Sequence, residues 1–148
     1  LADKLEIRGT NTINISHDHG AFKAEFAHKT EAGADFRSTV YAAIPARGSV
    51  VIDTGVHVEI PEGYTGFLKS KSGLNVKDNL IGEGVVDSGF SGSIRVKLYN
   101  LGDTNYQILR GDKIIQMVIL PCVYCEFTQV EKFAETERGD GGFGSTGR

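Results

Sequence analysis

Alternating apolar and polar residues run through much of this chain. Val56, Val58 and Ile60 would share one face of an extended strand, and residues 94–99 alternate in the same way. Period-two alternation predicts strands that bury one face. Short turn-forming segments separate these runs, and no long window shows helical periodicity. The pattern therefore predicts an all-β fold, a distorted jelly-roll-like sandwich or barrel.

Length and composition are those of one ordinary globular domain. The chain has 148 residues, of which 40% are apolar and 24% charged, enough to bury a core without disulfides. We expect a β domain over residues 1–130, followed by a flexible connector and a glycine-rich, mobile arm over residues 131–148. The formal net charge of −3 argues against direct nucleic-acid binding, because nucleic-acid binders are normally basic. A small polyphosphate remains a possible ligand if donors are concentrated locally.

Membrane and export signals are not apparent in the sequence. No apolar run reaches about 18 residues, so no membrane-spanning helix is expected. The first residues contain no apolar signal-peptide core, and we expect a cytoplasmic protein.

Two cysteines and four histidines raise redox and metal chemistry as alternatives. Cys122 and Cys125 form a C-x-x-C pair, but they lie in a strand-like apolar run without a second ligand pair. Two buried or half-buried thiols are therefore expected. The His-Asp-His sequence at residues 17–19 has a metal-like composition, yet a solvated loop is favoured. His28 and His57 are expected at the surface.

The last eleven residues, 138–148, offer little to a core. Five glycines surround Arg138, Phe143, Ser145 and Thr146. Glycines let consecutive backbone N–H groups converge on an anion, while hydroxyl and guanidinium groups suit phosphate oxygens. An aromatic ring beside such a phosphate nest indicates a nucleotide site. A frayed terminus is the alternative.

Four earlier segments combine charged or aromatic residues with glycine. They are residues 32–38 with Asp35, residues 70–74 with Lys71, residues 84–92 with Asp87 and Phe90, and residues 111–116 with Gln116. Each alone is compatible with an ordinary turn or strand end. Their joint occurrence in one chain is more specific.

In this order and spacing, the five segments resemble the five motifs of the trimeric dUTPases, which hydrolyse dUTP to dUMP and pyrophosphate. The matching sequences are Ala-Gly-Ala-Asp-Phe-Arg-Ser, Ser-Lys-Ser-Gly-Leu, Gly-Val-Val-Asp-Ser-Gly-Phe, Gly-Asp-Lys-Ile-Ile-Gln and Arg-Gly-Asp-Gly-Gly-Phe-Gly-Ser-Thr-Gly. The resemblance covers about residues 30–147, and the short segment between Leu74 and Gly84 is similar to the phage and Gram-positive type. It implies dUTP as substrate, Mg²⁺ as cofactor and a homotrimer with shared active sites.

The resemblance also implies roles for single residues. Asp87 would be the base that orients and deprotonates the water attacking the α-phosphate. Asp35 would act on the water shell of Mg²⁺. The phosphates would be bound by Lys71, Ser72, Gly73, Gln116, Arg138, Ser145 and Thr146. The base and sugar would be bound by Gly84, Val85, Val86, Phe90 and Phe143, with Phe90 under the deoxyribose and Phe143 stacked on uracil.

Three positions depart from the family pattern, and two rival functions remain. Lys71 stands where Arg is usual, so a point charge replaces a bidentate fork, and Phe90 stands where Tyr is usual. Ala34 stands where Tyr or Leu is often found, a change expected to alter packing only. A dCTP deaminase or a bifunctional deaminase-dUTPase would share the fold. A nucleotide-dependent regulator would bind dUTP without hydrolysing it, and would have a repressor-type protein partner if the chain is phage-encoded.

Overall fold

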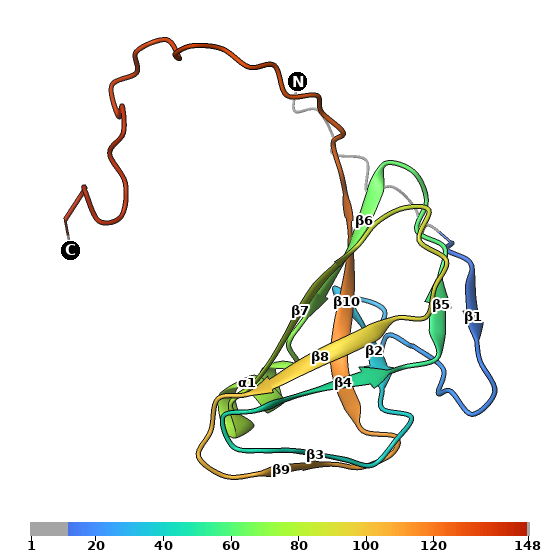
Figure 1. The fold of residues 1–148 in the computed structure, drawn as a ribbon. Helices are drawn as coiled ribbons and strands as arrows, with labels where there is room; N and C mark the ends of the chain where they lie inside the picture. Colours follow the sequence, from blue (N-terminus) through green and yellow to red (C-terminus); the bar gives the residue numbers. More distant parts are fainter. Residues whose placement is uncertain (1–11, 148) are drawn as a thin grey trace.

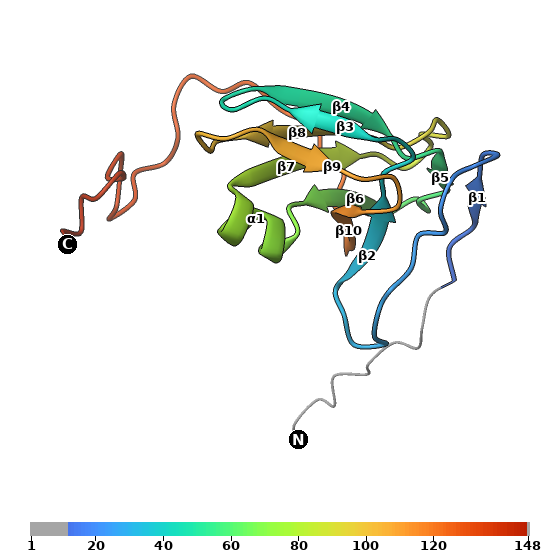
Figure 2. The ribbon, with the colours of Figure 1, turned by 90° about the horizontal axis from the view of Figure 1, so that it is seen from below.

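A strongly curled β-sheet organises residues 12–147, which are the residues described by the computed structural model (Figure 1). The elements are β1 (Ile15–His17), β2 (Gly33–Arg37), β3 (Ala42–Ile44), β4 (Ser49–Asp53), β5 (Val56–Val58), β6 (Tyr64–Lys69), α1 (Ser72–Asp78), β7 (Leu80–Val86), β8 (Arg95–Asn100), β9 (Tyr106–Ile108) and β10 (Lys113–Pro121). Six strands form the main sheet in the order β2-β10-β6-β7-β8-β4, and two ribbons, β1–β5 and β3–β9, accompany it. Both views place α1 and β1 on opposite sides of the sheet domain (Figure 2).

The inside of the curled sheet holds one cluster of buried apolar side chains. Val56 and Val58 on β5 are 0% and 6% exposed, as their alternation predicts. On β8, Val96 and Leu98 point inward while the residues between them are exposed. Each such side chain contributes about 1.5–3 kcal/mol through burial. The predicted all-β, jelly-roll-like fold is confirmed.

The short helix α1 was not predicted. It spans only seven residues and buries none of them fully, so it leaves no helical periodicity in the sequence. Lys71 is its N-cap residue, and Asn79 ends it in the left-handed conformation with φ 56°. The helix therefore places the Ser-Lys-Ser-Gly-Leu segment at the turn between β6 and β7. No helix in the described part of the chain is long and apolar enough to cross a membrane.

The chain leaves the sheet earlier than the apolar run around the cysteines predicts. Pro121, which lies opposite Tyr64, is the last residue of β10. The strand ends there because proline has no N–H with which to continue the hydrogen-bond ladder. Cys122 is half-buried but Cys125 is exposed, so the prediction of two buried or half-buried thiols is wrong for Cys125. Beyond this point the chain runs away from the sheet (Figure 1).

Candidate active site

A pocket opens where β7 and β8 separate. The two strands pair only over Leu80–Gly82, whereas β7 pairs with β6 over Glu83–Val86. The backbone groups of Glu83–Val86 that point toward β8 therefore have no strand partner. The pocket has a volume of about 590 Å³, and its lining includes Gly84, Val85, Val86, Asp87, Phe90 and Arg95. We refer to it as the β7–β8 pocket. Five of the residues predicted to bind base, sugar or water thus lie together.

Residues 87–94, the β7–β8 loop, form one wall of this pocket. The Phe90 N–H donates to the Asp87 carbonyl at 3.3 Å, and Gly89 has φ 85°, so the loop begins with a turn that requires a left-handed residue. The Phe90 ring is 47% exposed. A Cβ at Gly92 would lie 2.6 Å from its Cζ, so glycine there lets the ring approach the backbone.

The Asp87 carboxylate is exposed at the end of β7. Among residues 12–147, no hydrogen bond or ion pair engages its side chain. Its neighbours are held instead: the Ser88 Oγ lies 2.9 Å from the Tyr124 hydroxyl, and the Ser93 hydroxyl hydrogen-bonds the Asp53 carboxylate. A loop held by these hydrogen bonds therefore presents an unpaired carboxylate, as a general base for water requires.

A second cluster, the Asp35 cluster, surrounds a buried carboxylate on β2. Asp35 is 2% exposed, with one oxygen paired to the Lys71 ammonium and the other 3.0 Å from the Lys113 Nζ. Burial would raise the pKa of the Asp35 carboxyl, but the hydrogen bonds and charges of the two lysines outweigh it and hold the pKa below its ordinary value. Lys113 is a member of this cluster that the sequence did not single out.

Gln116 lies beside the Asp35 cluster. It is directly opposite Asp35 in the β10–β2 register, and its Nε2 donates to the Ser70 carbonyl at 3.0 Å. A Cβ at Gly33 would lie 2.4 Å from the Gln116 Oε1, so glycine makes room for this side chain. The predicted phosphate-binding residues of the second and fourth motifs are thus adjacent, with Ser72 and Gly73 exposed in the first turn of α1.

The Asp35 cluster does not fit a metal site within one chain. Both Asp35 oxygens are already paired with ammonium groups, which repel a cation. No group of three or more His, Cys, Asp or Glu residues within 12–147 could hold a metal ion. In this chain the Asp35 carboxylate is paired with two lysines instead.

The two clusters are far apart in one chain. Glu83 on β7 lies directly opposite Lys69 on the antiparallel strand β6. Asp87 follows Glu83 by four residues in one direction, and Lys71 follows Lys69 by two residues in the opposite direction. Six residue steps at about 3.3 Å separate Asp87 from Lys71 by about 20 Å. The predicted base and the predicted phosphate-binding lysine therefore do not face one another within one chain.

The C-terminal arm, residues 131–147, joins neither cluster. Phe143 is fully exposed with φ 50°, and the arm curves through solvent away from the sheet (Figure 1). The Arg138 Nε donates to the Gly141 carbonyl at 2.7 Å, and the Ser145 N–H donates to the Gly142 carbonyl at 3.1 Å. Thr146 is exposed as well. These predicted ligand groups are therefore ordered into local turns but are not brought to the pocket by their own chain.

Comparison with known proteins identifies the family. The family model for dUTPase matches residues 24–147. A deoxyuridine 5'-triphosphate nucleotidohydrolase from Clostridium tetani is 39% identical over 127 residues, covering 84% of this chain and 88% of the relative. One from Rhizobium johnstonii is 37% identical over 144 residues, covering 93% and 92%. The chain belongs to the dUTPase family.

Solved structures of phage dUTPases share the fold. The dUTPase of Staphylococcus bacteriophage 80alpha with dUpNHpp has a TM-score of 0.87 and 33% identity, covering 94% of this chain and all of the other. A mutant dUTPase from phage phi11 of S. aureus has a TM-score of 0.76 and 32% identity, covering 83% and 99%, and that protein coordinates a structural Mg(II) ion. The predicted likeness to phage dUTPases is confirmed.

Proposed function

We propose that this protein hydrolyses dUTP to dUMP and pyrophosphate. The observation that carries the proposal is the unpaired Asp87 carboxylate at the end of a pocket walled by unpaired backbone of β7, in a chain of the dUTPase family. Asp87 would orient a water for in-line attack on the α-phosphorus and accept its proton. The new P–O bond forms as the bond to the pyrophosphate leaving group breaks.

The backbone of Gly84–Val86 would select the base. Peptide groups fixed by the β6 pairing can match the donors and acceptors of uracil, and cytosine presents a donor where uracil presents an acceptor. Buried peptide groups left without partners reject such an analogue strongly. Phe90 would lie under the deoxyribose, where crowding excludes a ribose hydroxyl.

The Asp35 cluster would bind the triphosphate. Lys71 carries a positive charge that Asp35 holds in place, and Gln116 lies beside it. Ser72 and Gly73 would add a hydroxyl and a backbone donor. We propose that Mg²⁺ would enter together with the substrate and would neutralise part of the charge of the triphosphate.

A complete site would need more than one copy of the chain. Because about 20 Å separates Asp87 from Lys71, we propose a homotrimer in which one copy supplies the β7–β8 pocket and another the Asp35 cluster. The arm of a copy would then close over the nucleotide, with Arg138, Ser145 and Thr146 on the phosphates and Phe143 on the base. The full exposure of the Phe143 side chain in one chain supports this role.

Pyrophosphate release from dUTP, dCTP, dTTP and UTP, with and without Mg²⁺, tests the function. We expect release from dUTP with Mg²⁺ and at least about 100-fold lower kcat/KM for the other nucleotides. Ammonia release from dCTP would instead establish the deaminase interpretation. Tight dUTP binding without pyrophosphate release at saturating Mg²⁺ would establish a nucleotide-dependent regulator.

Mixing inactive chains tests the shared site. Asp87→Asn and Lys71→Ala would each be inactive alone, and we expect activity to return when the two are unfolded and refolded together, because hybrid assemblies contain some intact composite sites. Size-exclusion chromatography with light scattering would show the trimer. Failure of the mixture to recover activity, with hybrids demonstrated by mass spectrometry, would place the whole site in one chain.

Regulation is a second candidate function. The similar 80alpha phage dUTPases control the transfer of virulence genes. We propose that a protein partner of the repressor type binds the form of the protein in which the arm has closed over dUTP. Pull-down of such a repressor in the presence of dUpNHpp, but not of dUMP, would support it, and equal capture in both states would remove the nucleotide dependence.

A further inference from the structure

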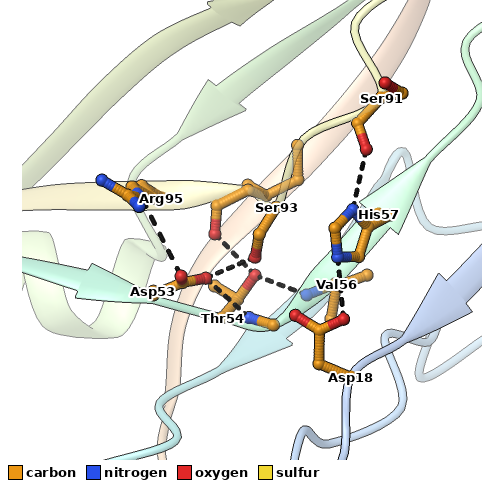
Figure 3. Close-up of polar contacts among 10 residues, drawn as sticks. Asp18, Asp53, Thr54, Val56, His57, Ser91, Ser93 and Arg95 are labelled. Atoms are coloured by element: carbon orange, nitrogen blue, oxygen red, sulfur yellow. Dashed lines mark hydrogen bonds and ion pairs between the residues drawn. The ribbon is translucent and has the colours of Figure 1, made fainter.

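His57 joins three segments that are distant in sequence. It projects from β5 between the loop that follows β1 and the β7–β8 loop (Figure 3). Its Nδ1 lies 2.8 Å from the Ser91 carbonyl oxygen, and its Nε2 lies 2.9 Å from an Asp18 carboxylate oxygen. The side chain is 28% exposed. The sequence predicted a surface position for His57; the structure shows a partly exposed side chain that also hydrogen-bonds two distant segments.

The chemistry of the two partners defines the state of the ring. A backbone carbonyl oxygen and an ionised carboxylate are both acceptors and cannot donate. Neutral imidazole donates from only one nitrogen, whereas the imidazolium form donates from both. Only the doubly protonated ring therefore makes both hydrogen bonds. Loss of one proton breaks the bridge on one side.

An unfilled space between Phe90 and the β1–β5 ribbon leaves the His57 hydrogen bond as a constraint on the β7–β8 loop from that side. A cavity of about 320 Å³ separates the β1–β5 ribbon from the loop and is lined by Ser16, His57, Glu59, Gly89, Phe90 and Ser91. Side chains do not fill this space, so packing does not fix the Phe90 backbone from that side. The His57 bond to Ser91, the residue after Phe90, supplies a polar constraint in its place.

We propose that doubly protonated His57 is a positioning residue for the dUTPase reaction, which holds the β7–β8 loop at Ser91 so that the neighbouring Phe90 contacts the nucleotide. The inference rests on the role proposed above for Phe90. Its consequence is that affinity for dUTP falls when His57 loses a proton.

The surroundings of His57 favour the protonated ring. The hydrogen bond to the Ser91 carbonyl raises the pKa of His57 most, partial burial opposes it, and the Asp18 hydrogen bond with the charges of Asp18 and Asp53 raises it further. Arg95 lies 3.8 Å from Asp53 and moderates that charge, and Glu59 lines the same cavity. Because the folded-state pKa is raised, the bridge is complete below the ordinary histidine pKa and is lost as the pH rises through the raised value.

The experiment measures KM and kcat for dUTP from about pH 5.5 to about pH 9, a range that brackets histidine titration. In the wild type, KM should rise toward high pH. His57→Gln has no charge and one donor group, so we expect KM about fivefold to tenfold higher at low pH and independent of pH across this range, with kcat changed less than about threefold. His28→Gln, at an exposed position in the turn before β2, is the matched control and should keep the wild-type profile.

Asp18→Asn sharpens the test, because it keeps the shape of the partner and removes its charge. The rise in KM should then begin at lower pH than in the wild type. In the wild-type protein, ¹⁵N–¹H spectra of the His57 ring should show both nitrogens protonated at neutral pH. This measurement does not depend on any variant that fails to fold.

Two results would overturn the proposal: an unprotonated ring nitrogen of His57 at neutral pH, or a wild-type KM profile in folded His57→Gln. The variant Asp87→Asn distinguishes failure of the proposed His57 role from failure of the proposed function. If Asp87→Asn is inactive while His57→Gln behaves as wild type, the reaction assignment stands and only the positioning role is lost. If wild-type protein does not hydrolyse dUTP at all, the proposed function fails first.

Discussion

The β7–β8 loop and the C-terminal arm contain similar residues but are constrained very differently. Both are rich in glycine and both present an exposed phenylalanine, Phe90 in the loop and Phe143 in the arm. The loop is tied to β4, β5 and Tyr124 by side-chain hydrogen bonds, whereas the polar contacts of residues 131–147 lie within the arm itself. Composition alone therefore does not distinguish the β7–β8 loop, which is held by the rest of the fold, from the arm, which contacts only itself within one chain.

The two segments also suit different steps of the proposed reaction. A general base needs a fixed position before the substrate arrives, because misplacement by about 1 Å can cost about 100-fold in rate. A lid must open to release product, so it is drawn from segments with few contacts. In the proposed reaction the loop would serve the chemistry and the arm the closure of the site, and three substitutions and one truncation test this comparison.

The largest effect should come from the loop. Asp87→Asn keeps the size of the side chain but removes the base, so we expect kcat to fall about 1,000-fold or more. Binding of dUpNHpp by calorimetry should change less than about threefold, because the carboxylate acts on water. Glu83→Gln is the control, since Glu83 lines the same pocket but is paired with Lys69. Turnover near the wild-type rate in Asp87→Asn would remove Asp87 as the base.

Truncation after Glu137 should produce the next largest effect and should act on closure only. We expect kcat/KM to fall about 100-fold, because the phosphate and base contacts of Arg138, Phe143 and Ser145 are lost. The thermal midpoint should stay the same within error, since the removed residues make no hydrogen bond with the sheet among residues 12–147. A large drop in the midpoint would show that the arm is part of the fold, and an unchanged rate would show that it is not a lid.

Asp35→Asn should act on stability, in contrast to both segments. It leaves two ammonium groups without their counter-charge, and we expect unfolding free energy to fall by about 2 kcal/mol, below the range for fully buried pairs because the lysines are partly exposed. The depressed pKa of Asp35 means that this contribution is present above the ordinary Asp pKa and is lost as the pH falls through the lowered value.

Denaturant titrations across acid pH would measure the Asp35 effect. Asp103→Asn, which breaks the exposed pair with Arg47, is the control and should change stability by less than about 0.5 kcal/mol. If both variants lose the same stability, the lysine pairs around Asp35 do not stabilise the fold.

The smallest effect should come from the contact between the β7–β8 loop and Tyr124, which lies in the segment between β10 and the arm. The Tyr124 hydroxyl accepts from the Gly63 N–H at 2.9 Å and hydrogen-bonds Ser88, next to Asp87. Tyr124→Phe should lower kcat/KM about threefold, because it loses a net hydrogen bond of about 1 kcal/mol at an exposed site. Tyr41→Phe, at a 70% exposed position, is the control. An effect as large as that of the truncation would mean that loop and arm are not independent.

Most of the fold could be predicted from local alternation, whereas the candidate site residues were predicted from the resemblance of five motifs to a known family. The alternation in Val56, Val58 and Ile60 predicted buried strand faces, and all three are buried. The grouping of Gly84, Asp87 and Phe90 in one pocket followed from their closeness in sequence. Helix α1 was missed because seven residues without a buried face leave no periodic signal, and Cys125 was misplaced because the strand ends at Pro121.

The sequence by itself determined the family, the order of its five motifs and the turns that glycine makes possible. Only the tertiary structure decided that Asp35 faces two lysines, that β7 parts from β8 beside Asp87, and that about 20 Å separates Asp87 from Lys71. It also decided the hydrogen-bond partners of His57, which are 39 and 34 residues away. Local patterns record which face of a strand is buried, but strand order in the sheet sets which distant residues meet, and no local pattern encodes that order.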